Sequence, residues 1–171
     1  MTTTSAKLYS LEFANKKTYL FATMFIIGNV LFPQLAHALI PQGGLIFLPI
    51  YFFTLIGAYK YGIRVGLLTA LLSPVINHLL FGMPPAPMLP IILIKSTVLA
   101  IAAALAARHF GKVSFGGILL AVVAYQLIGG GAEFMLTQSI AKTSRDFLLG
   151  YPGIILQLAG GFLLLKSLEK V

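Results

Sequence analysis

Cysteine is missing from this sequence, and charged residues are scarce. None of the 171 residues is cysteine, which excludes disulfide bonds and thiol chemistry and leaves the redox compartment open. Only 9% of the residues are charged, whereas a soluble domain usually carries about 25%. Hydrophobic residues make up 58%, in runs that reach the roughly 20 residues needed to cross a hydrocarbon core about 30 Å thick. The composition therefore predicts an integral membrane protein embedded in a lipid bilayer.

Motifs of common catalytic sites are missing as well. The chain has no Gly-x-Ser-x-Gly elbow, no His-Glu-x-x-His pair and no glycine-rich phosphate loop with a lysine. Ser73 and His78 share one apolar run, but Pro74 follows the serine directly. His37 and His78 lack the spacing of a metal site, so each is interpreted singly as a hydrogen-bonded packing histidine. We expect no enzyme, no cofactor and no metal site.

The net charge of +8 does not indicate nucleic-acid binding, because no basic face is interleaved with aromatic residues. The basic residues cluster at the ends of apolar runs, which is how Lys and Arg set the orientation of a membrane protein. Nine fall on one side and two on the other, with Lys95 inside a span. The two are Lys142 and Arg145, and the nine, expected in the cytoplasm with both termini, are Lys7, Lys16, Lys17, Lys60, Arg64, Arg108, Lys112, Lys166 and Lys170.

The apolar runs predict an all-α fold, a compact bundle of six transmembrane helices in one domain, residues 1–171. Residues 1–17 are expected to be a polar cytoplasmic leader and not a cleaved signal, because no small-residue cleavage site follows a short apolar core. Five spans is the alternative if the last run is partly interfacial. The expected spans are 18–40, 45–59, 65–82, 89–107, 115–139 and 147–167.

Polar side chains from five of these spans fall at a similar depth, near the outer face. Lys95 lies roughly 10 Å inside its span, given a rise of 1.5 Å per residue. Polar and ionisable groups inside a bilayer usually face a cavity or a partner, so the layer predicts an outward-facing ligand pocket. The expected substrate-binding residues are Gln42, Asn77, His78, Lys95, Tyr125, Gln126, Glu133 and Gln157.

Two features of this layer have alternative explanations. Lys95 either contacts an anionic or carbonyl group of a ligand, pairs with Glu133 to fix the bundle, or extends to the outer surface. The run Gly129-Gly130-Gly131 either unwinds a helix beside the ligand or lets two helices pack closely. The alanines of the fourth span are expected to serve packing.

The stretch from Pro41 to Phe110 resembles the substrate-binding S components of energy-coupling factor (ECF) vitamin transporters. The resemblance lies in LIFLPIYFFTLIGAYKYGIRVGLLTALLSPVINHLLFGMPPAPMLP, which is followed by an Ala-rich span. Its marks are a Pro-containing second span, a Tyr-Gly basic turn and a Gly-Met-Pro-Pro outer loop. The length, six spans and cytoplasmic termini agree with the same family.

This resemblance implies a function and partners. Such proteins bind a vitamin or related micronutrient near the outer face, in a pocket lined by the first loop and the later spans. They deliver it through a separate ECF transmembrane scaffold subunit and two ATPase subunits in the plasma membrane of bacteria or archaea. Docking commonly uses an Ala-x-x-x-Ala motif in the first span. Here that strict motif is missing, and the nearest ridge of small residues is Ala14, Thr18 and Ala22.

Two other functions remain as hypotheses. One is a membrane scaffold of the bacterial cell-shape or division machinery, which needs partner surfaces but no polar pocket. The weaker one is a facilitator that transports without a partner. For the S component, the polar residues suggest a vitamin-sized polar ligand that carries a carboxylate if Lys95 is not neutralised by Glu133.

Overall fold

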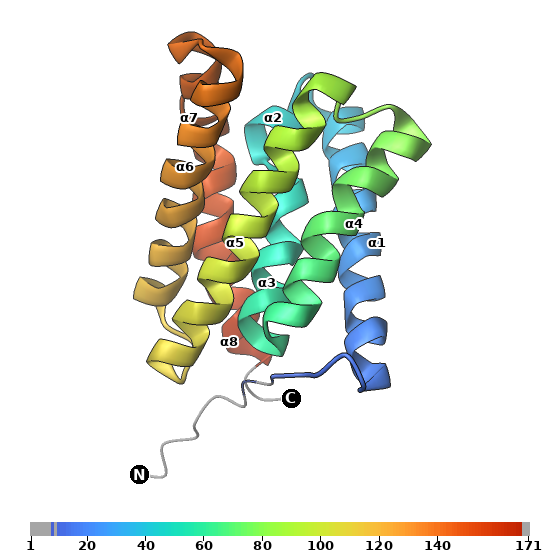
Figure 1. Ribbon diagram of the computed structural model, residues 1–171, viewed down its shortest axis with the longest axis vertical. Helices are drawn as coiled ribbons and strands as arrows, with labels where there is room; N and C mark the ends of the chain where they lie inside the picture. Colours follow the sequence, from blue (N-terminus) through green and yellow to red (C-terminus); the bar gives the residue numbers. More distant parts are fainter. Residues whose placement is uncertain (1–7, 9, 169–171) are drawn as a thin grey trace.

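The computed structural model describes residue 8 and residues 10–168, except for the side chains of Lys142, Arg145 and Asp146. Within this part of the chain all regular structure is helical and no strand occurs, as the sequence predicts (Figure 1). Lys7 and Lys170, which contribute to the expected charge bias, lie outside the described residues. In chain order the elements are α1 (Lys16–Leu39), α2 (Gly43–Phe47), η1 (Pro49–Tyr51), α3 (Phe52–Tyr61), α4 (Ile63–Phe81), η2 (Ala86–Met88), α5 (Leu89–Phe110), α6 (Phe115–Thr137), α7 (Ile140–Ile155), η3 (Leu156–Gly160) and α8 (Gly161–Leu168).

Five helices of the described chain are long and apolar enough to cross a membrane. They coincide with the first, third, fourth, fifth and sixth expected spans, with ends that move by a few residues. These five helices are Lys16–Leu39, Ile63–Phe81, Ala86–Phe110, Phe115–Thr137 and Phe147–Leu168. The chain is therefore compatible with a multi-pass membrane protein.

The expected second span is helical but broken into α2, η1 and α3. Leu48 has a left-handed backbone with φ of 45°, which costs an L-residue roughly 1–2 kcal/mol. Pro49 follows, and it lacks an N–H group and disfavours a right-handed helical conformation in the residue before it. None of the three pieces is long enough to cross a bilayer alone, because α3 has only 10 residues.

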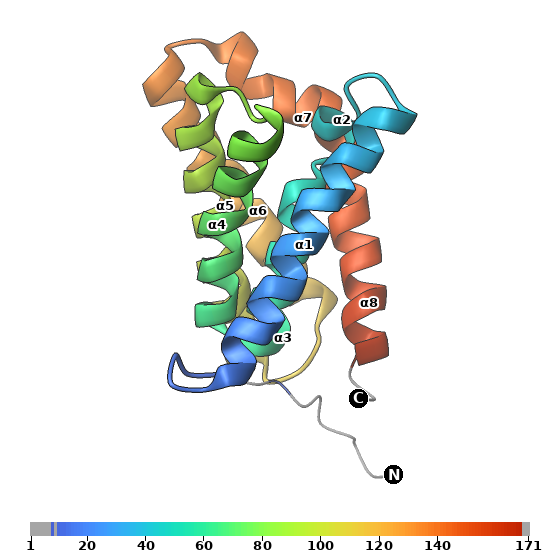
Figure 2. The same cartoon turned by 90° about the vertical axis from the view of Figure 1, so that its right-hand side faces the viewer.

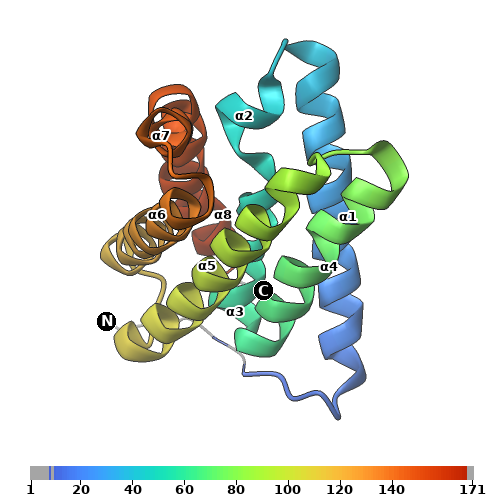
Figure 3. The same ribbon diagram turned by 45° about the horizontal axis from the view of Figure 1, so that its top comes forward.

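Helix α3 lies at the centre of the bundle and is buried over almost its whole length. It packs against α1, α4 and α5, and α5 in turn packs against α4 and α6 (Figure 3). Small residues allow these close approaches, which agrees with the expected packing role of the alanines. The buried alanines of α5 are Ala100, Ala103, Ala104, Ala106 and Ala107.

The helices alternate between two ends of the bundle. The upper end of Figure 1 carries the connections at 40–42, 82–85 and 138–139, and the lower end carries those at 62 and 111–114 (Figure 1). Helix α1 begins and α8 ends at the lower end. In the side view, α7 runs across the upper end before the chain descends through η3 and α8 (Figure 2).

The close contact of α3, α4 and α5 generates a prediction at Gly66. A Cβ atom there would lie 2.5 Å from Ala58 Cβ and 2.9 Å from Ala58 Cα, so the backbones would have to separate. We expect Gly66→Ala to destabilise the bundle by about 1–3 kcal/mol, the usual cost of overpacking. Thermal melting in detergent measures this. The control is Gly131→Ala, where a Cβ meets nothing within 4 Å, and which should be neutral or stabilising because Ala favours a helix over Gly. Equal melting temperatures for Gly66→Ala and the unchanged protein would contradict the packing.

Candidate functional site

Seven of the eight expected site residues fall into two separate groups. Gln42 and Asn77 border a cavity near α1, α2 and α4. Lys95, Tyr125, Gln126 and Glu133 lie between α5 and α6, and Gln157 lies in η3 on the same side of the bundle. His78 belongs to neither group. The structure therefore separates residues that were expected to line one pocket, and their role in binding stays a prediction.

The first group borders a cavity of about 370 Å³ at the upper end, between α1, α2, α4 and the 83–88 loop. Its walls are mainly apolar, and its polar lining consists of Gln34, His37, Gln42 and Asn77. Asn77 is buried, and its amide is engaged by the chain: Nδ2 donates to the carbonyl oxygens of Asn29 at 2.9 Å and Ser73 at 3.2 Å. Its Oδ1 accepts from Gln34 Nε2 at 3.3 Å. Asn77 therefore joins α4 to α1.

Asn29 extends the same network to the broken helix. Its Oδ1 accepts from the backbone N–H of Phe53 at 3.2 Å, which lies in the first turn of α3. Its Nδ2 donates to Thr54 Oγ1 at 3.0 Å and Ser73 Oγ at 3.3 Å. The first N–H groups of a helix have no partner within the helix, so Asn29 stabilises the start of α3. This network is a structural element of the fold.

His78 is half-buried and holds a loop. Its Nδ1 lies 2.7 Å from the carbonyl oxygen of Pro84, which fixes the 82–85 connection against α4. This contact agrees with the interpretation of His78 as a packing histidine. His37 lines the cavity of the first group, and no cluster of three or more metal-ligating side chains occurs in the described chain.

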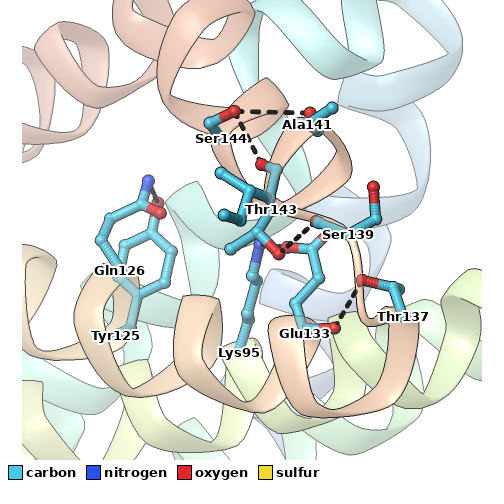
Figure 4. A network of polar contacts seen from close by, with 10 residues as sticks. Lys95, Tyr125, Gln126, Glu133, Thr137, Ser139, Ala141, Thr143 and Ser144 are labelled. Atoms are coloured by element: carbon cyan, nitrogen blue, oxygen red, sulfur yellow. Dashed lines mark hydrogen bonds and ion pairs between the residues drawn. The ribbon is translucent and has the colours of Figure 1, made fainter.

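The centre of the second group is a buried ion pair. Lys95 Nζ donates to Glu133 Oε2 at 2.5 Å, and the side chains are 1% and 4% exposed. Both rise toward the first turn of α7, which carries Thr143 and Ser144 (Figure 4). Of the alternatives for Lys95, the structure contains the pairing with Glu133 and not extension to the outer surface.

The glycine run of α6 accommodates this lysine. Helix α6 is continuous through Gly129-Gly130-Gly131, so the run does not unwind the helix. A Cβ atom at Gly129 would lie 2.4 Å from Lys95 Cγ. The aliphatic part of the Lys95 side chain therefore packs directly against the α6 backbone at Gly129. Close packing is therefore the role of Gly129, and it brings Lys95 within reach of Glu133 one turn further along α6.

Tyr125 and Gln126 form the neighbouring part of the second group. Gln126 Nε2 donates to the Tyr125 hydroxyl at 3.1 Å, and both side chains are buried. The Tyr125 ring lies against Tyr51, with ring centroids 5.1 Å apart. Sequence reasoning missed Tyr51, although its position two residues after the helix-breaking Pro49 is a usable signal. Gln126 also borders a shallow groove of about 460 Å³ between α6 and α7.

Gln157, like Ser96, differs from the other buried polar residues that the structure describes. Its side chain is fully buried, and neither Oε1 nor Nε2 has a hydrogen-bond partner in the described part of the chain. The Ser96 hydroxyl, next to Lys95 in sequence, is also buried and without a partner there. More than nine in ten buried polar groups in proteins are hydrogen-bonded. Gln157 lies in η3, a π-helical segment, and such segments are frequent at functional sites.

The proposed docking ridge is only partly at the surface. Ala14 is exposed and lies in the turn before α1. Thr18 and Ala22 are buried within the chain, and Thr18 Oγ1 donates to the carbonyl oxygen of Glu12. In this conformation a partner would reach Ala14 alone, and the docking role of the three residues stays a prediction.

Comparison of the chain with protein-family models, with curated proteins and with solved structures gives no significant match.

The ion pair generates the second prediction. We expect Lys95→Met to destabilise the protein by about 3–5 kcal/mol, because it leaves the Glu133 carboxylate buried without its partner. The double variant Lys95→Met with Glu133→Gln should recover most of this loss, since it leaves no single buried charge. Lys112→Met, at an exposed position, is the control and should change little. The melting temperatures of the three variants test this prediction. A double variant as unstable as Lys95→Met would show that the unpaired Glu133 charge is not the source of the lost stability.

Proposed function

We propose that this chain is the substrate-binding S component of an ECF-type importer. It captures a vitamin or related micronutrient from outside the cell and passes it on through a scaffold subunit and two ATPase subunits. In this proposal the chain crosses the plasma membrane of a bacterium or archaeon six times, with 43–61 as the broken second crossing. The lower end of Figure 1, where α1 begins and α8 ends, faces the cytoplasm in this proposal.

The observation that supports a binding role is the buried amide of Gln157, which makes no hydrogen bond within the described chain. A scaffold or a lipid-embedded anchor gains nothing from a buried amide that makes no hydrogen bond, and burying one costs about 1–3 kcal/mol. Asn29 and Asn77 are also buried, but their hydrogen bonds join helices. Gln157 has no such bonds within the described chain, so a role in ligand recognition explains its presence best.

The segment above Gln157 has the properties of a movable cover. Helix α2 packs on α7 through two glycines: a Cβ at Gly150 would lie 2.8 Å from Leu48 Cδ1, and one at Gly153 would lie 2.4 Å from the Phe47 carbonyl. Gln42 and Leu48 flank α2, and both have left-handed backbones, with φ of 60° and 45°. Strained positions of this kind occur at ligand clamps and switch regions. Movement of α2 relative to α7 would open a path from the upper end.

Charge supports the proposed orientation. Lys16, Lys17, Arg64, Arg108 and Lys112 all lie at the lower end, near the starts of α1, α4 and α6 or the end of α5. Short cytoplasmic segments carry an excess of Lys and Arg, so this end is assigned to the cytoplasm. The cover α2 then faces outward, as capture of an external ligand requires.

The proposal predicts ligand-dependent stability without hydrolysis. Purified protein should melt at a higher temperature with one member of a vitamin panel, because a ligand at 100 times its Kd stabilises the folded state by about 2.7 kcal/mol. The isolated chain should hydrolyse no ATP. Mass spectrometry of the compound that co-purifies identifies the ligand directly.

Other outcomes favour the other functions. A flat response to every compound, with nothing co-purified, would favour the membrane scaffold. Uptake by the chain alone in liposomes would favour the facilitator, and ATP hydrolysis by the isolated chain would exclude the S component.

The cover predicts a further result at Gly153. In Gly153→Ala the new Cβ would collide with the Phe47 backbone, which should separate α2 from α7 and weaken retention of the ligand. We expect the Kd for the co-purified compound to rise by roughly tenfold or more, equivalent to about 1.4 kcal/mol of binding, and the amount of compound per protein to fall. Gly131→Ala should retain its ligand because that position is open. Full occupancy in a folded Gly153→Ala protein would exclude the α2–α7 contact from ligand retention.

A further inference from the structure

The donors and the acceptor of the Gln157 amide determine which hydrogen-bonding groups a ligand must have in order to pair with it. A primary amide presents one acceptor oxygen and two N–H donors in a single plane. In Gln157 both ends are buried and without partners in the described chain. A molecule that satisfies them must offer a donor and an acceptor side by side. Ring lactams, ureides and carboxamides have this edge, whereas carboxylates offer acceptors alone.

The neighbours of Gln157 follow from its helix face. Gly153 and Gly161 flank it on the same face at a spacing of four residues. A Cβ at Gly153 would touch Phe47 and Leu48, and one at Gly161 would lie 3.2 Å from Leu55 Cδ2. Gln157 therefore faces the segment between Leu48 and Leu55. That segment contains the buried Tyr51, whose ring lies against Tyr125.

Backbone irregularities occur in both of the segments that pack together here, α2 to α3 and α7 to η3. The buried residue Leu48 has a left-handed backbone conformation, and residues 156–160 are π-helical. Regular helices would pack here with less strain. Two independent deviations beside one unpartnered amide point to a site that is shaped for something other than the stability of the bundle.

The charges in the second group do not select an anion. Lys95 and Glu133 neutralise each other at 2.5 Å, so Lys95 gives no reason to expect a carboxylate on the ligand. The neighbouring rings of Tyr51 and Tyr125, which are tilted by 40° to each other, and a neutral amide instead suit a flat, uncharged ring.

We propose that the ligand carries a planar amide-type edge, an N–H beside a C=O in a lactam, ureide or carboxamide, and that Gln157 recognises this edge beside Tyr51 and Tyr125. This inference rests on the proposed function and narrows the class of substrate. Gln157 is then a specificity-determining residue.

The first test needs no ligand. Gln157→Met keeps the volume and removes the unpartnered amide, so the ligand-free protein should melt at an equal or higher temperature, by up to about 2–4 °C. Gln126→Met is the matched control: its amide donates to the Tyr125 hydroxyl, and its loss should lower the melting temperature. A lower melting temperature for ligand-free Gln157→Met would show that the amide has a structural partner and would overturn the inference.

The second test compares ligands that have the amide-type edge with ligands that lack it. The pairs are nicotinamide with nicotinate, and biotin with lipoate, and binding is measured by thermal shift and calorimetry. The compound that co-purifies with the protein is identified in parallel. The inference expects a co-purified compound with an amide-type edge, or binding of a pair member that has it, and at least tenfold weaker binding to Gln157→Met.

The outcomes separate this inference from the proposed function. Tight binding of a compound without the edge, or unchanged affinity in Gln157→Met, would overturn the role of Gln157 and leave the S component standing. Absence of binding to any compound, with nothing co-purified, would overturn both.

Discussion

Each polar group buried in an apolar bundle needs a partner within the protein, because no lipid tail can supply one. The break between α2 and α3 makes this constraint acute, since it leaves backbone N–H groups without helical partners at the start of α3, which is buried over almost its whole length. Asn29 resolves it by accepting from the Phe53 N–H while it donates to Thr54 and Ser73. One amide of α1 thus stabilises the start of α3 and ties it to α4. The broken helix is tolerated because this network satisfies it.

This constraint divides the bundle into two sides. On the side of α1 and α4, the amides of Asn29 and Asn77 are engaged in joining helices, and the adjoining cavity is mainly apolar. On the side of α6 and η3, the charges of Lys95 and Glu133 cancel, but Gln157 is left without a partner in the described chain. The polar groups on the first side therefore hold helices together, whereas the proposed recognition residue lies on the second side.

Depth in the bundle was predictable from the sequence, and orientation around each helix was not. A constant rise of 1.5 Å per residue places Lys95 and Glu133 near one level, and the structure pairs these two side chains. Hydropathy also located five helices of membrane-spanning length. The side of the bundle that each residue faces depends on how helices pack, so the sequence did not separate Asn77 from Lys95. Pro49 is a signal in the sequence for the break between α2 and α3. The left-handed backbone of Leu48 and the lack of a hydrogen-bond partner for Gln157 are properties of the assembled bundle.

An unpartnered amide also bears on how a small, mostly apolar protein can be selective. Apolar walls distinguish ligands weakly, because one methylene is worth only about 1–3 kcal/mol. A buried polar group discriminates more strongly, since a ligand without the matching edge leaves it unsatisfied in the bound state as well. The ion pair of Lys95 and Glu133 strengthens this effect by keeping the surroundings neutral, so that a simple anion gains little from Lys95. If Gln157 binds the ligand as proposed, the stability lost by burying its unpaired amide in the free protein becomes the free energy that separates a matching ligand from a close analogue.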